Sequence, residues 1–110
     1  MPGQVRIDGQ VVDRAVVRYT PSPECMAVLC VRLSTSDGLT WSVRHPCGTQ
    51  PADAMAAERK ASTLRIGARC EVYAAGARVS TTRQGDPELV ALGVSNVIPL
   101  GIFTPVTSGD

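Results

Sequence analysis

Residues 4–17 read QVRIDGQVVDRAVV, and this stretch decides the fold because its side chains alternate in character. Val5, Ile7, Gly9 and Val11 fall on one side and polar residues lie between them, as in a strand that buries one face. The alternation changes phase around residues 13–14, and Gly9 lies inside the run. We therefore predict a strand with a bulge or bend that lets a small sheet curl.

The remaining chain contains short apolar runs broken by Gly, Pro, Ser or Asp, which is typical of strands and turns. We predict further strands at residues 25–33, 39–45, 68–79 and 88–100, and one short helix at residues 52–64, which has no internal Gly or Pro. In the strand at 39–45, Trp41 and Val43 share one face, and Ser42 and Arg44 share the other.

Composition and spacing alone predict a small barrel or sandwich. Three strands, a helix and two strands are the order of a five-stranded OB-fold barrel, with the helix between strands three and four. We therefore predict an all-β protein with one OB-type domain at residues 1–103 and a flexible C-terminal tail at residues 104–110.

Eleven Lys and Arg against ten Asp and Glu give a net charge of +1, so the overall field cannot attract a polyanion. Affinity for nucleic acid then requires a local arrangement of charges. No stretch approaches the about 18 apolar residues that span a bilayer, and we expect a soluble, cytoplasmic protein. The four cysteines form no C-x-x-C pair, and we expect them to be reduced.

The segment Arg18-Tyr19-Thr20-Pro21-Ser22 resembles the link after the first strand of the bacterial single-stranded DNA-binding protein family. The resemblance continues in the same order over residues 39–41 with Gly48, the predicted helix, and residues 66–76, IGARCEVYAAG. It covers roughly residues 4–100. It implies an OB fold, binding of single-stranded DNA without sequence preference, no metal or cofactor, a homo-oligomer (dimer or tetramer), and a nucleoid-associated location.

In that family, bases stack on aromatic side chains while phosphates lie against cations. Trp41, which matches the family's tryptophan strand, is the first stacking candidate, and its alternative role is a core indole. Tyr19 and Tyr73 are candidates for base contact, subunit contact or packing at the barrel rim. We expect phosphate contacts from a groove face that carries the indole beside arginines, chosen from Arg14, Arg18, Arg32, Arg44, Arg78 and Arg83.

The chain also departs from the family. It has only four aromatic residues, and Cys47 stands where an aromatic residue commonly precedes the closing glycine, so we expect weaker or more salt-sensitive binding. We also expect it to lack the long tail with an acidic tip by which typical members recruit replication and repair enzymes, as in the short tail-less OB relatives that include the primosomal replication protein. Replication or restart proteins are further candidate partners, and the alternative function is a primosome-type or adaptor OB protein that acts mainly through protein–protein interaction.

Catalysis and metal binding have little support in the sequence. His45 and Cys47 with Cys25 and Cys30 lack the paired spacing of structural zinc sites. No nucleophile and base stand in a recognisable pattern, and no glycine-rich phosphate loop opens a helix. We expect neither an enzyme nor a metal protein.

Overall fold

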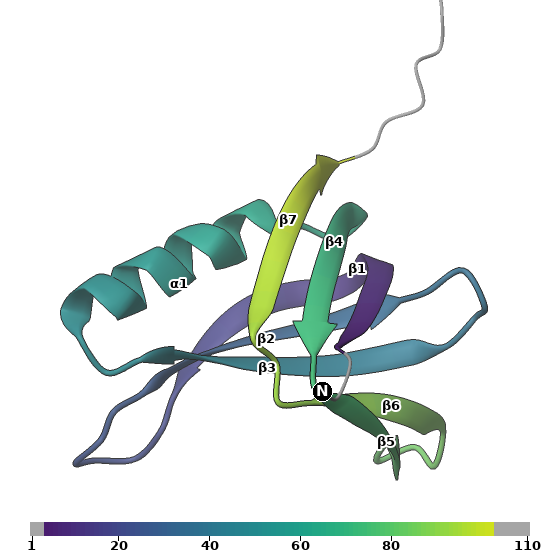
Figure 1. Cartoon of the computed structure of the whole chain (residues 1–110), viewed down its shortest axis with the longest axis horizontal. Coiled ribbons are helices and arrows are strands. Elements are labelled where there is room, and N and C mark those ends of the chain that lie inside the picture. The colour runs from purple at the N-terminus through teal and green to yellow at the C-terminus, as the bar shows by residue number, and fades with distance from the viewer. Residues whose placement is uncertain (1–3, 103–110) are drawn as a thin grey trace, which may run out of the picture.

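The computed structural model describes residues 4–102, which form seven strands and one helix in a single sheet (Figure 1). The strand order across the sheet is β5-β6-β3-β2-β1-β4-β7. The elements in chain order are β1 (Val5–Tyr19), β2 (Ala27–Ser34), β3 (Thr40–Gly48), α1 (Pro51–Thr63), β4 (Ala68–Ala74), β5 (Gly76–Thr81), β6 (Pro87–Leu92) and β7 (Asn96–Ile102). The predicted tail at 104–110 lies outside the described residues.

The long strand β1 joins two parts of the sheet. Its first half pairs antiparallel with β4, and from Gln10 onward it pairs with β2. The register shifts on both sides of Asp13, which confirms the irregularity predicted there. Such shifts increase twist and bend a strand. As a result, β4 and β7 cross the direction of β2 and β3 (Figure 1).

The predominantly β class is confirmed, and so is a helix between the third and fourth strands. The number of strands was wrong, because the chain forms seven strands in a sheet that does not close into a barrel. The predicted strand at 68–79 is split into β4 and β5, and the predicted strand at 88–100 is split into β6 and β7. Only the β5–β6 part reaches β3, through a short parallel pairing of Trp41 with Leu89 and Ser42 with Val90.

Both predicted strands are divided at the point where the hairpin that they form bends. The N–H of Ala75 donates to the carbonyl oxygens of Leu92 (2.8 Å) and Gly93 (3.1 Å). Gly93 has a φ of +60°, and a Cβ there would lie 2.9 Å from the Cβ of Ala75. This backbone crossing favours glycine because left-handed φ is costly for other residues. The paired strands therefore change direction together at this point.

One apolar core lies on the inner face of the sheet, where alternating residues of the strands meet. Its fully buried side chains include Val11, Leu29, Leu33, Val43, Leu64, Val72 and Val97. Each contributes on the order of 1.5–3 kcal/mol relative to an exposed position. The opposite face of β1, β2 and β3 is left for polar side chains.

The helix α1 begins and ends close to the predicted limits. The backbone N–H of Gln50 donates to Oδ2 of Asp53 (3.0 Å), and Pro51 occupies the first turn, where its missing N–H costs nothing. Ala57 is the buried residue of the helix, and Leu64 enters the core directly after it. Within residues 4–102, no helix has both the length and the apolar character needed to cross a membrane.

A substitution at Gly9 tests how closely the backbones of β1 and β2 approach each other. A Cβ at Gly9 would lie 2.9 Å from the carbonyl oxygen of Ser34 and 3.1 Å from the Cβ of Leu33. We expect Gly9→Ala to lower the free energy of unfolding by about 1–3 kcal/mol through overpacking. Gly76→Ala is the matched control, because a Cβ at Gly76 meets nothing within 4 Å. Equal urea midpoints for the two variants would contradict this account.

Candidate functional site

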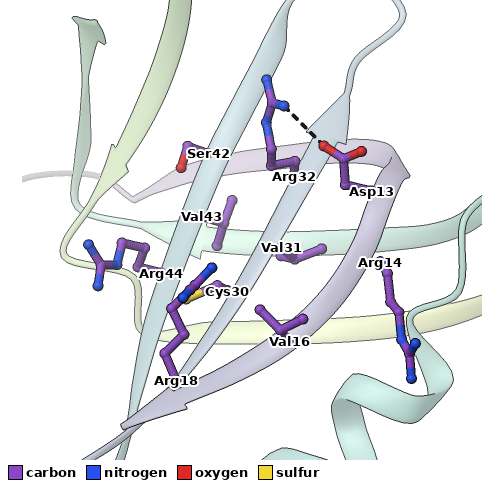
Figure 2. A pocket seen from close by; sticks show the side chains of 10 residues that line it. All are labelled: Asp13, Arg14, Val16, Arg18, Cys30, Val31, Arg32, Ser42, Val43 and Arg44. Atoms are coloured by element: carbon purple, nitrogen blue, oxygen red, sulfur yellow. Dashed lines mark hydrogen bonds and ion pairs between the residues drawn. The ribbon is translucent and has the colours of Figure 1, made fainter. Parts of the chain in front are cut away.

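A groove of about 430 Å³ lies on the outer face of β1, β2 and β3 (Figure 2). Four arginines line it together with one carboxylate, a thiol, a hydroxyl and three valines. The lining residues are Asp13, Arg14, Val16, Arg18, Cys30, Val31, Arg32, Ser42, Val43 and Arg44. We call this hollow the central groove. It brings together three of the predicted phosphate ligands, Arg18, Arg32 and Arg44, and a fourth candidate, Arg14.

Strand alternation and register place these side chains side by side. Arg32 of β2 lies opposite Asp13 of β1 and Ser42 of β3. In the next row, Cys30 lies opposite Val16 and Arg44. Directly opposed side chains have Cβ atoms about 4.5–5.5 Å apart, and alternate residues along a strand share a face. The arginines therefore form a compact two-dimensional array.

The four arginines differ in their internal partners. Nη1 of Arg32 lies 3.0 Å from Oδ2 of Asp13, and Nη2 lies 3.1 Å from Oε2 of Glu88 on β6. Among the described residues, Arg14, Arg18 and Arg44 form no ion pair. Arg18 and Arg44 are exposed near Cys30, at the opposite end of the central groove from Arg32 and Asp13 (Figure 2). This end therefore carries positive charge with which no carboxylate of residues 4–102 forms an ion pair.

A second hollow, of about 560 Å³, adjoins that end and shares Arg18 and Arg44 with the central groove. We call it the tyrosine hollow because Tyr19 lines it. Tyr19 is 50% exposed, and its hydroxyl donates to Oε2 of Glu58 on α1 (2.9 Å). This hydrogen bond raises the pKa of Tyr19. Tyr19 is paired with Ala27 and its hydroxyl reaches α1, so its ring lies on the other side of β1 from Arg18, at the end of the strand where both residues line the same hollow.

The structure does not bring Trp41 to the central groove. Trp41 is paired with Leu33 on one side and Leu89 on the other, and it packs against the core as a partly buried side chain. The alternation predicted for residues 39–45 is confirmed, because Ser42 and Arg44 line the groove and Val43 is fully buried. The same alternation directs Trp41 to the face opposite the arginines. The expectation of an indole beside arginines on one face is therefore not met.

Tyr73 lies in a different part of the sheet. On β4, opposite Arg6 of β1, its hydroxyl donates to Oε1 of Glu71 (3.0 Å). Arg6 donates to the other carboxylate oxygen of Glu71 and also lies 3.4 Å from Asp8. Hydrogen bonding from Tyr73 and then from Arg6 lowers the pKa of Glu71. Tyr73 is therefore tied into a charged cluster apart from the central groove.

Arg78 and Arg83 are both exposed but line neither hollow. Arg78 on β5 is paired with Val90, which is in turn paired with Ser42, so Arg78 shares the sheet face of the central groove two strands further along. Arg83 lies in the turn between β5 and β6. The predicted basic hairpin is present, but its two arginines lie outside the central groove and the tyrosine hollow.

Sequence reasoning missed Cys30 and the two carboxylates that hold Arg32. The alternation from Arg32 to Cys30 within one strand was the available signal for Cys30. Glu88 gave no comparable signal, because its contact with Arg32 depends on the parallel pairing of β6 with β3. His45 and Cys47 lie close, with 3.9 Å between Nδ1 and Sγ. Within residues 4–102, no three His, Cys, Asp or Glu side chains gather as a metal site requires.

Comparison of the chain with models of protein families matches none of them, and comparison with curated proteins also finds no match. The resemblance to single-stranded DNA-binding proteins therefore stays a prediction, supported by the residues quoted for it.

The Glu71 cluster predicts a pH-dependent contribution to stability. Because the folded-state pKa of Glu71 is lowered, this contribution is present above its ordinary pKa of 4.5 and is lost as the pH falls through the folded value. We expect Glu71→Gln to reduce the free energy of unfolding at about pH 7 and to have a much smaller effect at about pH 3.

The measurement is a urea titration of both proteins at each pH. Glu24→Gln is the control, because Glu24 is exposed and makes no side-chain hydrogen bond to a described residue. A destabilisation by Glu71→Gln that is the same at both pH values would contradict the assignment.

Proposed function

We propose that the protein binds single-stranded DNA without sequence preference, through the central groove and the adjoining tyrosine hollow. The observation that carries this proposal is the array of Arg14, Arg18 and Arg44, which have no ion pair among the described residues and lie on one sheet face. Arginine binds phosphate with a planar fork and also stacks on bases. A chain with a net charge of only +1 gains affinity for a polyanion from such local clustering.

Tyr19 is the proposed base platform. It is half exposed, lies in the hollow that Arg18 and Arg44 also line, and is held by its bond to Glu58. A base stacked on its ring leaves the adjoining phosphate within the reach of the two arginines. Stacking tolerates every base because each has a π face. This combination favours a single strand, whose bases are free to leave the backbone.

The proposal includes an OB-type fold in which β4 with β5, and β6 with β7, act as two bent strands of a five-stranded unit. Supporting features are the position of α1 between β3 and β4 and the parallel pairing of β3 with β6. OB folds are partly open barrels, and their strands and loops commonly bind oligonucleotides. We also propose a homo-oligomer, associated with the nucleoid, that serves DNA replication, repair or recombination.

The arginine array predicts a specific loss of binding. We expect the double variant Arg18→Ala/Arg44→Ala to weaken binding of labelled oligo-dT and to reduce the slope of log K against log salt by about 1.4, or about 0.7 for each phosphate contact. Fluorescence anisotropy at several salt concentrations measures both quantities. Arg69→Ala, an exposed arginine on β4, is the control. Unchanged affinity in the double variant would refute this site.

The stacking role proposed for Tyr19 predicts a second loss of DNA affinity, which is separable from that of the arginines. We expect Tyr19→Leu to cost about 1–3 kcal/mol of binding free energy, and Tyr19→Phe, which keeps the ring, to retain most of the affinity. Tyr73→Leu is the matched control because Tyr73 lies outside both hollows. The same anisotropy titration is used. If Tyr73→Leu lowered affinity as much as Tyr19→Leu, the stacking role assigned to Tyr19 would fail.

An adaptor function is the second candidate, and exposed apolar side chains favour it. Val79 is 71% exposed and Leu39 is 44% exposed, and both border a hollow of about 240 Å³ that Pro87 and Leu89 also line. Surfaces of this kind commonly contact other proteins. Normal folding with no binding of oligo-dT at low salt would favour the adaptor over the DNA-binding function.

A further inference from the structure

Arg14 belongs to two hollows at once. It lines the central groove, and it also lines a third hollow of about 450 Å³ with Ala61, Ser62, Leu64, Arg65 and Ile66. We call this third hollow the helix-end hollow because its other residues come from the end of α1 and the segment that follows. Figure 2 shows the side chain of Arg14 turned away from Arg18 and Arg44 toward this helix. The guanidinium of Arg14 therefore stands between the two depressions.

The segment that forms the helix-end hollow is anchored to β1. Leu64 is 1% exposed in the core, and the N–H of Gly67 donates to the carbonyl oxygen of Val11 (2.8 Å). Between these anchors, Arg65 and Ile66 face solvent, and Ile66 is 65% exposed. A cation and an apolar side chain are thus held at a defined place next to Arg14.

The three hollows concentrate the positive charge of the chain. Within residues 4–102, five of the eleven Lys and Arg line them, against one of the nine Asp and Glu, Asp13. The other described residues then carry six basic and eight acidic groups. The basic residues follow a continuous path, because Arg18 and Arg44 join the tyrosine hollow to the central groove and Arg14 joins that groove to the helix-end hollow.

We propose that a bound single strand continues past Arg14 into the helix-end hollow, where Arg65 contacts a phosphate and Ile66 offers an apolar surface to a base. The inference rests on the proposed function and extends it, because it assigns the length and direction of the binding path. The strand runs from Tyr19 along β1 toward the end of α1. Arg65 is then a ligand that only longer oligonucleotides reach.

The test is a length series of labelled oligo-dT, from about 4 to about 16 nucleotides, with Arg65→Ala. Affinity for the shortest oligomer that binds is expected to equal that of the unchanged protein. For the longest oligomers, affinity at 0.1 M salt is expected to fall about fivefold, and the slope of log K against log salt to decrease by about 0.7. Arg59→Ala, an exposed arginine on α1 that lines none of the three hollows, should have no effect at any length.

The outcomes separate this inference from the proposed function. If oligomers of every length bind to the unchanged protein and Arg65→Ala matches it throughout, the extension is wrong while the central groove stands. An equal loss at all lengths places Arg65 in the primary site and also overturns the extension. If no oligomer binds to the unchanged protein, the proposed function itself fails. Arg65→Glu provides a second variant, for which the length-dependent loss should be larger.

Discussion

The double pairing of β1 is the constraint on which the rest of the structure depends. The first half of β1 pairs with β4 and the second half pairs with β2, so β1 must bend without losing its backbone hydrogen bonds. The register shifts around Asp13 supply that bend, and Gly9 allows the backbone to approach Ser34 closely. Because side chains alternate along the strand, the apolar core and the arginine array are opposite faces of this one element.

The sequence predicted the individual strands and the helix better than it predicted how the strands join into a sheet. Alternation correctly placed Ile7, Val11 and Val43 on the buried face, although Leu39, assigned to the same face as Val43, is 44% exposed. Turn residues correctly separated the first three strands. The bend of the second hairpin was missed, because it depends on the contact between Ala75 and Gly93 across two strands. A glycine in an apolar run signals a possible bend, but the sequence does not reveal which backbone comes near it.

The candidate site was likewise predicted in part, where strand alternation decides the position of a side chain. Arg18, Arg32 and Arg44 were expected on one face, and cross-strand register brings them into one groove. Trp41 was chosen for its resemblance to a family position, although the alternation of its own strand directs it away from Arg44. The pairing of Arg32 with Glu88 joins residues 56 positions apart, and no local pattern indicates such a contact.

The two carboxylates on Arg32 mean that part of the groove carries its own counterions. A phosphate that reaches Arg32 competes with Asp13 and Glu88 for its positive charge, and these groups stay attached to the protein instead of entering the bulk solution. The exposed carboxylate then attracts a cation of its own, which offsets the cation that the neutralised phosphate releases from the nucleic acid. The salt sensitivity of any polyanion complex at this face should therefore reflect fewer charges than the number of arginines lining it.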